Sequence, residues 1–566
     1  MKHALLLAAL SPCLAADVST DADESPRRPN IVVILADDLG YGDVACNNPD
    51  RGKIATPQID RLARDGMRFT DAHSSSGVCS PTRYTLLTGR YHWRTRLQSG
   101  IVGVFDPPLI APDRLTLAGL LKGQGYRTAC IGKWHLGWDW PIPSGKEALF
   151  RAKPTTPGAP PGDEQRAAWR ETFARPIGGG PTSRGFDAYF GTDVPNWPPY
   201  CFIENDRTAG IPSEFLAPGL MGKSQAGQQG PALPGWMLEP ILPTIAGRAC
   251  DFIERAAKES APFFLYLPLT APHTPIAVNR PWKGKSGLNA YGDFVMETDA
   301  VVGGVLDALE RSGAAADTLV VFTSDNGCAA QAGIAELKKK GHFPSGPLRG
   351  AKADVWEGGH RVPFLVRWPG VVKGGTRCDG LVQQADLMAT FAEVLGTTLP
   401  DDAGEDSVSL LPLLRGGDLL VRESAVNQSS QGMLAIRKGR WKLIFGPDGG
   451  GKGPDQPPAQ LYNLADDLAE SRNLHASRPE IVAELTALME RTVDRGRSTP
   501  GTPRRNDVPV DWKRFLKTGG RPAKTGARDE GRGSGQYLAD HPAVYVGESA
   551  PDAVVVEAQA LVVEAK

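Results

Sequence analysis

Four apolar runs along the chain predict buried β-strands, and polar residues follow each run directly. An unbroken run of apolar and β-branched residues is typical of a strand that is covered on both faces. The runs comprise residues 31–35, 126–131, 263–267 and 319–322. The polar residues that follow them are Asp37-Asp38, Lys133-Trp134-His135, Thr270 to His273 and Ser324 to Gly327.

Helical patterns lie between these runs. Periodic apolar residues predict helices over residues 58–67, 115–121, 245–258 and 294–309. Strands that alternate with helices predict an α/β fold, with a large and mostly parallel central sheet flanked by helices. Ligands of such sheets bind beyond the carboxyl ends of the strands. The polar residues after the four runs therefore mark the expected site.

The pattern changes after residue 400. Apolar runs at 433–437 and 441–445 predict a hairpin, and residues 460–464 predict a further short strand. A helical pattern over 480–491 follows. Together they predict a smaller C-terminal α+β subdomain with an antiparallel sheet over residues 401–500.

The remaining segments carry less periodicity. We expect the catalytic domain to cover residues 28–400, with a loop-rich insertion over the site at residues 140–240, where Pro and Gly are frequent. The tail over residues 501–566 is rich in basic residues, Gly and Pro at first, and its structure stays open.

The first 16 residues have the pattern of a signal peptide. Lys2 supplies a positive charge, residues 4–10 are apolar, and Ala15-Ala16 are small residues before Asp17. No later stretch reaches the roughly 18 to 20 apolar residues of a membrane span. We expect an exported protein, periplasmic or secreted, without a membrane span.

Composition narrows the class of protein. The 566 residues include 63 Lys and Arg against 64 Asp and Glu, which argues against a nucleic-acid binder. A hydrophobic content of 41% excludes wholesale disorder.

The segment Cys79-Ser80-Pro81-Thr82-Arg83 combines a nucleophile with a cation. Pro81 suits a first helical turn, which places Cys79 at a helix N-terminus, where an anion is favoured. Arg83, one turn later, could point to the same place and bind a sulfate or phosphate in a fork. By itself, Cys79 is equally typical of a buried structural cysteine.

Two further sets of side chains suit an anionic substrate and a metal. Lys133 and His135 are two residues apart, so they share one face of an extended segment. The oxygen donors of Asp37-Asp38 and Asp325-Asn326 are of the kind that Ca²⁺ or Mg²⁺ prefers. Each acidic pair alone is also typical of a turn.

The segments around Cys79 and around Lys133 resemble the two signature sequences of the sulfatases that use a formylglycine residue. The Cys79 to Arg83 stretch matches the family's Cys-x-Pro-x-Arg consensus, and Gly132 to His135 matches its second signature. The resemblance covers roughly residues 28–480. Departures are small: Thr82 stands where serine is commoner, and alanines flank Lys352. Further matching segments, in family order, are Asp37-Asp38, His273-Thr274-Pro275, Asp325-Asn326-Gly327, Leu348 to Lys352 and Trp356 to Gly359.

The resemblance implies a modified nucleophile and a metal. A maturase would convert Cys79 into formylglycine (3-oxoalanine), whose hydrated aldehyde attacks sulfur. One Ca²⁺, with Mg²⁺ as an alternative, would be bound by this residue and four others. Those four are Asp37, Asp38, Asp325 and Asn326.

The resemblance also implies roles for five further side chains. Arg83 would orient the modified residue, and Lys133 and Lys352 would neutralise the sulfate oxygens. His135 would act as the base that re-forms the aldehyde. His273 would protonate the leaving alcohol, with Lys352 as a possible helper.

Other functions stay open on the sequence. The main rival is a phosphonate monoester or phosphodiester hydrolase of the same alkaline phosphatase superfamily, and a zinc phosphatase is a weaker one. A third alternative is an inactive glycan-binding relative. We expect a sulfated glycan or an aryl sulfate as substrate, and we expect Trp134, Trp138 and Trp140 to be core or pocket wall rather than a sugar platform.

The cysteine count isolates Cys79. Of eight cysteines, Cys13 would leave with the signal peptide, and an odd number then remains. With Cys79 modified, six are left, and both disulfide pairing and free thiols stay open for them. They are Cys46, Cys130, Cys201, Cys250, Cys328 and Cys378.

Overall fold

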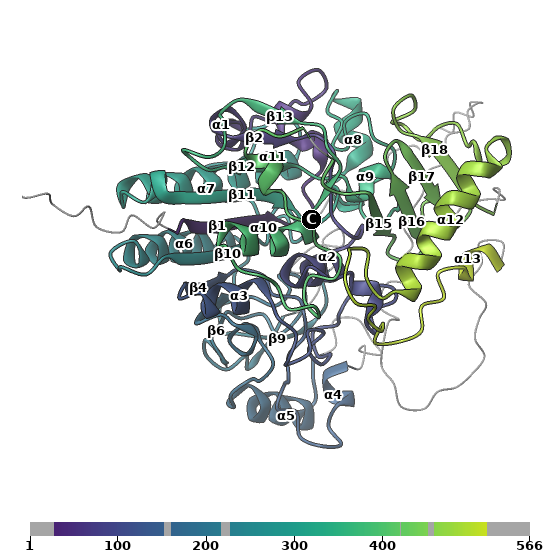
Figure 1. Cartoon of the computed structure of the whole chain (residues 1–566). Coiled ribbons are helices and arrows are strands. Elements are labelled where there is room, and N and C mark those ends of the chain that lie inside the picture. Colours follow the sequence, from purple (N-terminus) through teal and green to yellow (C-terminus); the bar gives the residue numbers. More distant parts are fainter. Residues whose placement is uncertain (1–27, 152–159, 217–226, 419, 451–457, 518–566) are drawn as a thin grey trace, which may run out of the picture.

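A ten-stranded sheet with a parallel centre organises the molecule (Figure 1). The computed structural model describes residues 28–151, 160–216, 227–418, 420–450 and 458–517. The parallel strands, in spatial order, are β11 (Thr318–Ser324), β1 (Asn30–Ala36), β10 (Phe263–Pro268), β4 (Arg127–Ile131) and β5 (Ala188–Gly191). The predicted α/β fold is confirmed.

Shorter strands complete both edges of this sheet. Beyond β11 lie β12 (Phe364–Arg367), β2 (Met67–Phe69) and β13 (Thr376–Cys378), and beyond β5 lie β6 (Ile203–Glu204) and β7 (Arg207–Thr208). β12 is antiparallel to β11, and β6 is antiparallel to β5. The sheet is therefore parallel at its centre and mixed at its edges.

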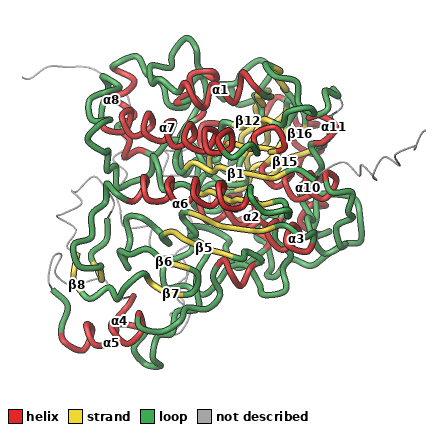
Figure 2. The backbone as a smooth tube through the Cα atoms, turned by 90° about the vertical axis from the view of Figure 1, so that its left-hand side faces the viewer, coloured by secondary structure: helices red, strands yellow, loops and turns green. Residues whose placement is uncertain are grey.

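The central strand β1 is buried on both faces because helices cover each side (Figure 2). Val32 and Ile34 pack toward α1 (Pro57–Asp65), α6 (Ile241–Ala256) and α7 (Ala290–Arg311). Ile31 and Val33 pack toward α2 (Cys79–Thr88), α3 (Leu117–Gly123) and α10 (Leu387–Val394). Alternate side chains point to opposite faces of a strand, so a strand between two helical layers must be apolar throughout.

The four strands predicted from sequence are direct neighbours. Their order, β11-β1-β10-β4, brings the carboxyl ends of four distant segments to one edge of the sheet. The predicted helices correspond to α1, α3, α6 and α7, which begin and end within a few residues of the expected positions.

A second, antiparallel sheet lies to the right in Figure 1. It contains β15 (Ser424–Gln428), β16 (Leu434–Lys438), β17 (Trp441–Ile444) and β18 (Gln460–Asn463). Leu485 and Met489 of α12 (Pro479–Asp494) pack in one cluster with Leu443 and Leu461 of this sheet. The predicted hairpin, third strand and helix are present, and β15 was not predicted.

Residues 140–240 contain more regular structure than the Pro and Gly content predicted. Besides β5 to β7, the segment forms α5 (Asp163–Phe173) and the pair β8 (Glu214–Leu216) and β9 (Gly230–Ala232). The remaining short elements are β3 (Ala72–His73), β14 (Val382–Gln383), α4 (Ala148–Arg151), α8 (Ile334–Lys339), α9 (Glu357–His360), α11 (Leu411–Leu414) and α13 (Arg514–Lys517).

Three tryptophans belong to the core of this region. Trp134 and Trp138 are 1% exposed and Trp140 is 8% exposed. Trp140 packs edge-on against Phe173 with ring centroids 5.5 Å apart. They form core, as expected, and are not exposed to receive a sugar.

A buried charged cluster joins the second sheet to the first. Arg437 of β16 donates to both oxygens of Asp71 at 2.6 Å, and Lys442 of β17 lies 2.9 Å from Glu357 and from Glu470. The six charged residues balance as three acids and three bases: Asp71, Glu357, Glu470, Arg361, Arg437 and Lys442.

Two buried histidines, His73 and His360, belong to this cluster. Burial lowers the pKa of His73 and of His360, and their Nδ1 atoms lie 3.0 Å apart. With Glu357 they form a buried group of metal-ligand type, yet the surrounding guanidinium and ammonium groups oppose a cation there. The cluster instead anchors the chain before α2, because the His360 carbonyl accepts from the Ser74 amide at 2.8 Å.

Within the described part of the chain, none of the helices combines the length and apolar character that a membrane crossing requires.

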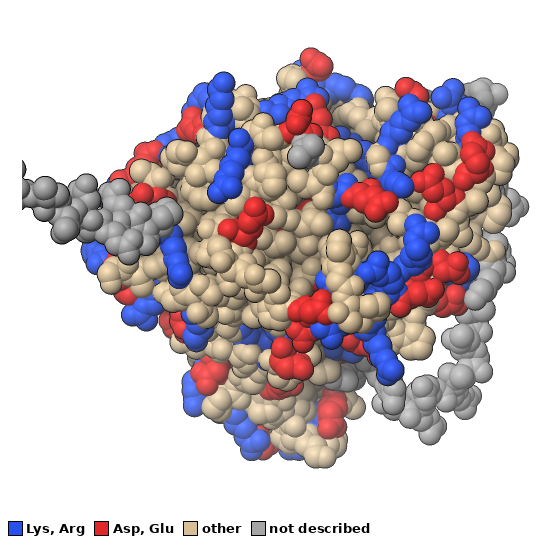
Figure 3. All heavy atoms as spheres, viewed as in Figure 1, with Lys and Arg blue, Asp and Glu red and all other residues tan. Residues whose placement is uncertain are grey.

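Seven cysteines lie in the described part of the chain, and all seven are free thiols. Charged side chains of both signs are interspersed on the face in Figure 3, in keeping with the formal net charge of -1. The predicted signal peptide and residues 518–566 of the tail lie outside the described residues.

The charged cluster predicts a strong stability effect at Lys442. Lys442→Met leaves two buried carboxylates without their ammonium partner, which costs about 3–5 kcal/mol. We expect a correspondingly lower midpoint in urea unfolding. The matched control is Lys438→Met at the end of the neighbouring strand β16, whose pairs with Glu423 and Glu484 are solvent-exposed and contribute less than about 1 kcal/mol. Equal effects of the two variants would contradict this account.

Candidate active site

Cys79 is the first residue of α2 and is buried beside His135. Its Sγ atom lies 3.3 Å from His135 Nδ1, and the residue is 2% exposed. The turn before it is held tightly, because the Gly77 carbonyl accepts from the Ala353 amide at 2.8 Å. A Cβ at Gly77 would lie 2.7 Å from the Asp354 carbonyl, so glycine is required there. The predicted position of Cys79 at a helix N-terminus is confirmed.

Arg83 connects three strand ends. Its Nη2 donates to Asp325 at 2.8 Å and lies 3.6 Å from Asp37, and its Nη1 donates to the Lys133 carbonyl at 3.0 Å. Although burial lowers the pKa of Arg83, the charges of Asp325 and Asp37 raise it overall. These groups bind Nη1 and Nη2, whereas Nε has no hydrogen-bond partner among the described residues. Arg83 therefore organises the acidic residues, and its direct contact with a sulfate stays a prediction.

Four oxygen-bearing side chains meet at the ends of β1 and β11. The Asp38 amide donates to Asp325 at 3.1 Å, and Asn326 Nδ2 donates to Asp38 at 2.7 Å. Asp38 has a φ of 66°, which turns the chain sharply after Asp37. All four side chains are at most 2% exposed. The structure therefore brings together the four predicted metal ligands outside Cys79.

Two lysines neutralise part of this acidic group. Lys133 Nζ lies 2.7 Å from Asp37, and Lys352 Nζ lies 2.7 Å from Asp38. Burial raises the pKa of Asp37, but Lys133 and the neighbouring cationic groups hold it well below its ordinary value. Burial and the charge of Asp37 raise the pKa of Asp325 well above its ordinary value. The two carboxyl groups therefore differ in how readily each of them ionises.

The donor set fits a divalent cation. Asp37 Oδ1 and Asn326 Oδ1 are buried and have no hydrogen-bond partner. Oxygen atoms left in this way cost free energy unless a cation or water satisfies them. Ligand atoms of Asp37, Asp38 and His273 lie within 4.8 Å of one another, although His273 was not among the predicted ligands.

The two site histidines have different tautomers. His135 Nε2 lies 3.0 Å from the Val102 carbonyl, which only accepts, so Nε2 carries the hydrogen and Nδ1 faces Cys79 as an acceptor. Burial and Lys133 lower the pKa of His135 to about 3. His273 places Nδ1 2.5 Å from the Thr274 carbonyl, which leaves Nε2 as the acceptor, 3.7 Å from Asp38. Burial and Lys352 lower the pKa of His273 to about 4.

Sequence reasoning missed the loop after β5. Asp193 Oδ1 accepts from the His135 amide and from Trp138 Nε1, each at 3.0 Å. The Trp197 ring packs edge-to-face on the His135 ring. The sequence does contain a pattern that predicts this strand, because residues 188–191 are a short, largely apolar run that ends before Thr192-Asp193. That run lay inside the segment expected to be loop-rich.

Tyr291 is a second missed residue. Its hydroxyl oxygen lies 2.6 Å from Asp43 Oδ2, to which it donates, and 3.1 Å from the Asp38 carbonyl oxygen. It comes from the first turn of α7, which follows the carboxyl end of β10. It therefore supports the turn that carries Asp38, and nothing in the local sequence distinguishes it from a core tyrosine.

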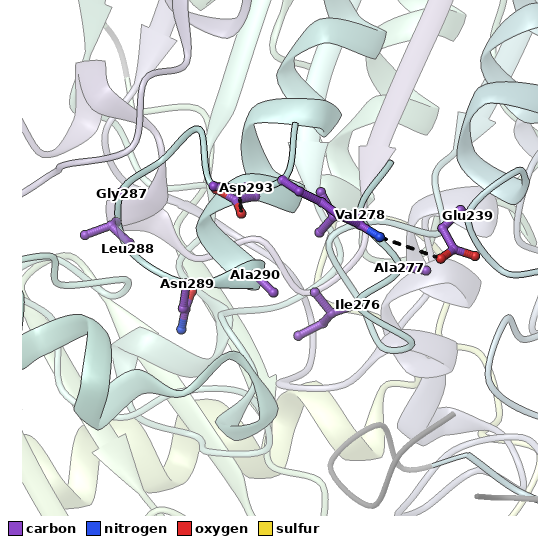
Figure 4. Close-up of a pocket in the computed structure, with 11 residues that line it drawn as sticks. Glu239, Ile276, Ala277, Val278, Gly287, Leu288, Asn289, Ala290 and Asp293 are labelled. Carbon is purple, nitrogen blue, oxygen red and sulfur yellow. Dashed lines mark hydrogen bonds and ion pairs between the residues drawn. The ribbon is translucent and has the colours of Figure 1, made fainter. Parts of the chain in front are cut away.

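A cavity of about 360 Å³ lies at the start of α7 and contains none of these groups (Figure 4). Ile276 and Val278 form an apolar wall, and Lys283 pairs with Glu239 at 4.0 Å across its end. Its walls begin three residues after His273. Its ionisable lining residues are Glu239, Lys283 and Asp293, and none of the predicted site residues lines it.

Two family models match the chain. One, described as Sulfatase, matches residues 29–397. The other, described as the C-terminal part of N-sulphoglucosamine sulphohydrolase, matches residues 351–495.

Similar proteins agree with these matches. An N-acetylgalactosamine-6-O-sulfatase of Bacteroides thetaiotaomicron is 33% identical over 517 residues, which cover 84% of this chain and 94% of that relative. Arylsulfatase A of Homo sapiens is 30% identical and covers 82% of this chain and 87% of its own length. A solved structure is also similar to this chain, with a TM-score of 0.70 and 32% sequence identity. Its description refers to the metabolism of multiple glycosaminoglycans by B. thetaiotaomicron. It covers 82% of this chain and 98% of its own.

Proposed function

The chain belongs to the sulfatase family and hydrolyses a sulfate ester, and from this premise we propose that it desulfates a sugar through a formylglycine made from Cys79 and one bound Ca²⁺. The observation that carries the proposal is the convergence around Cys79. A proton acceptor, a guanidinium-bound acidic group and two ammonium groups lie within one buried site.

Cys79 is the unmodified precursor of the proposed nucleophile. As the hydrated aldehyde, the residue supplies two hydroxyl groups on one carbon, one to attack sulfur and one to release the product. His135 Nδ1 faces this position without a hydrogen of its own and therefore can take up a proton there. Asp193 and Val102 fix the histidine from its two other sides.

Asp37, Asp38, Asp325 and Asn326 would hold the metal together with residue 79. A Ca²⁺ ion stabilises the negative charge of the sulfate and lowers the pKa of a hydroxyl group beside it. Hard oxygen donors favour Ca²⁺ or Mg²⁺, and the number of donors favours Ca²⁺. Arg83 holds Asp325 in place for this role.

Lys133 and Lys352 would bind the sulfate oxygens. Burial lowers the pKa of Lys352, but Asp38 raises it overall, so this ammonium group stays charged in the site. Charge that develops on the sulfate during bond cleavage is stabilised by such fixed ammonium groups. His273 Nε2 is free to take a proton when the anionic substrate arrives, and it would pass that proton to the leaving alcohol.

The proposed substrate class is a sulfated carbohydrate. The B. thetaiotaomicron relative named above acts on N-acetylgalactosamine 6-sulfate by its name, and we propose a 6-O-sulfated amino sugar as the first substrate to test. Aryl sulfates should serve as artificial substrates. A phosphonate monoester assayed in parallel tests the rival activity.

Export belongs to the same proposal. The charged start, apolar stretch and small residues of positions 1–16 support a signal peptide, and a glycan-degrading enzyme meets its substrate outside the cell. We propose a periplasmic or secreted enzyme that a formylglycine-generating maturase modifies before use.

The first prediction concerns residue 79. Protein produced with a maturase should carry an aldehyde at this position, which peptide mass spectrometry detects directly. Cys79→Ala should abolish sulfate release and keep the unfolding temperature. Cys250→Ala, which changes a half-buried thiol on α6, is the matched control and should retain turnover. An unmodified Cys79 in active protein would refute the mechanism.

A second prediction concerns the metal. Adding Ca²⁺ to chelator-treated protein should raise the unfolding temperature by several degrees, because a ligand at about 100 times its Kd adds about 2.7 kcal/mol of stability. Asn326→Ala should weaken this response. Glu336→Gln, at an exposed carboxylate, should leave it unchanged. A response that persists undiminished in Asn326→Ala would place the ion elsewhere.

A third prediction tests whether Lys352 acts on the sulfate itself or only through its contribution to the protein's overall charge. Lys352→Ala should lower kcat for sulfate release by about 10²–10³, the usual effect of removing one group that stabilises transition-state charge. Lys339→Ala removes an exposed lysine on α8 and should change kcat less than about twofold. If both variants behave alike, Lys352 does not contact the reacting group.

A further inference from the structure

We propose that Trp197 is a platform on which the sulfate-bearing sugar ring stacks, so that it sets the enzyme's affinity for carbohydrate. This inference rests on the proposed sulfatase function and names a residue that recognises the leaving group. The evidence is the position of Trp197, the rigidity of its loop and its partial exposure.

The position of Trp197 follows from the sheet. β5 is parallel to β4, so the loop after β5 lies at the same edge as Lys133 and His135. The Trp197 and His135 rings are 6.2 Å apart at 79°. Since His135 Nδ1 is 3.3 Å from Cys79 Sγ, only one side chain separates the indole from the nucleophile.

The loop that carries Trp197 is fixed at both ends. Asp193 accepts from the His135 amide, and Asn196 Nδ2 donates to Thr274 Oγ1 at 3.3 Å. The Tyr200 hydroxyl donates to the Asn196 carbonyl at 2.8 Å. The loop therefore bridges the segments of the two catalytic histidines, and a platform held in this way loses little conformational entropy on binding.

Trp197 differs from its neighbours in exposure. Asp193 and Asn196 are 5% and 3% exposed, whereas Trp197 is half-buried. Trp134, Trp138 and Trp140, which follow the second signature, are buried in the core. An indole offers a broad apolar face, and the C–H face of a hexose is the part of a sugar that gains from being removed from water.

A purely structural role is the alternative. In that case, Trp197 would only hold the His135 ring, and its removal would slow the chemical step for every substrate. A platform affects binding of the sugar instead, and it does not affect inorganic sulfate, which carries no sugar. Measurements of KM, kcat and sulfate inhibition therefore distinguish the two roles.

The test uses the full-length, Ca²⁺-loaded enzyme with N-acetylgalactosamine 6-sulfate. For Trp197→Ala, we expect KM to rise at least about tenfold with kcat changed less than about threefold. The inhibition constant of inorganic sulfate should stay within about twofold. Trp197→Phe should restore most of the affinity. The matched control is Trp441→Ala, a half-buried tryptophan at the start of β17.

A direct measurement of sugar binding tests the role of Trp197 independently of the proposed reaction. Calorimetry with full-length Cys79→Ala protein measures the Kd of the same sugar without turnover, and Trp197→Ala in that background should weaken it at least about tenfold. If wild-type enzyme releases no sulfate but this binding difference holds, the proposed function fails and the platform stands. A fall in kcat alone, an unchanged Kd, or no binding of the sugar overturns the platform.

Discussion

The burial of three carboxylates at one edge of the sheet is the constraint that organises the rest of the site. Asp37, Asp38 and Asp325 are at most 2% exposed and close enough to share partners. Like charges in such surroundings are tolerated only with compensating cations. The cations that pair with them are Lys133, Lys352 and Arg83, which come from three separate segments of the chain. Each of these segments must therefore reach the same edge for the protein to be stable.

The parallel sheet satisfies that requirement. Because β11, β1, β10 and β4 are adjacent and parallel, four loops begin at one edge without any long excursion of the chain. The second sheet adds support from outside, through the buried cluster around Glu357 that holds the segment before α2. Two buried charged groups thus hold the fold together, the acidic group at the strand ends and the cluster around Glu357.

Much of this arrangement could be predicted from the sequence, because unbroken apolar runs that end in acids, lysines or histidines have one simple explanation in a parallel sheet. Asp37, Lys133 and His273 were predicted for this reason. The ion pair of Arg83 with Asp325 was not predicted, since a helix pattern places the Cα of Arg83 but not the partner of its guanidinium. β5 was missed because it has only four residues and lies in a segment rich in Pro and Gly. The charged cluster was missed because Asp71 and Arg437 are 366 positions apart.

The two parts of the site are therefore under different physical constraints. Groups that would bind the sulfate and the metal are tied to one another by charge, so that a change in one exposes a buried partner. Trp197 contacts His135 through its ring and makes no ion pair in the described structure. Its loop is held by packing and by separate hydrogen bonds, whereas the acidic group is held by ion pairs that depend on one another. A substitution in this loop should consequently leave fewer charged groups unpaired than a substitution in the acidic group.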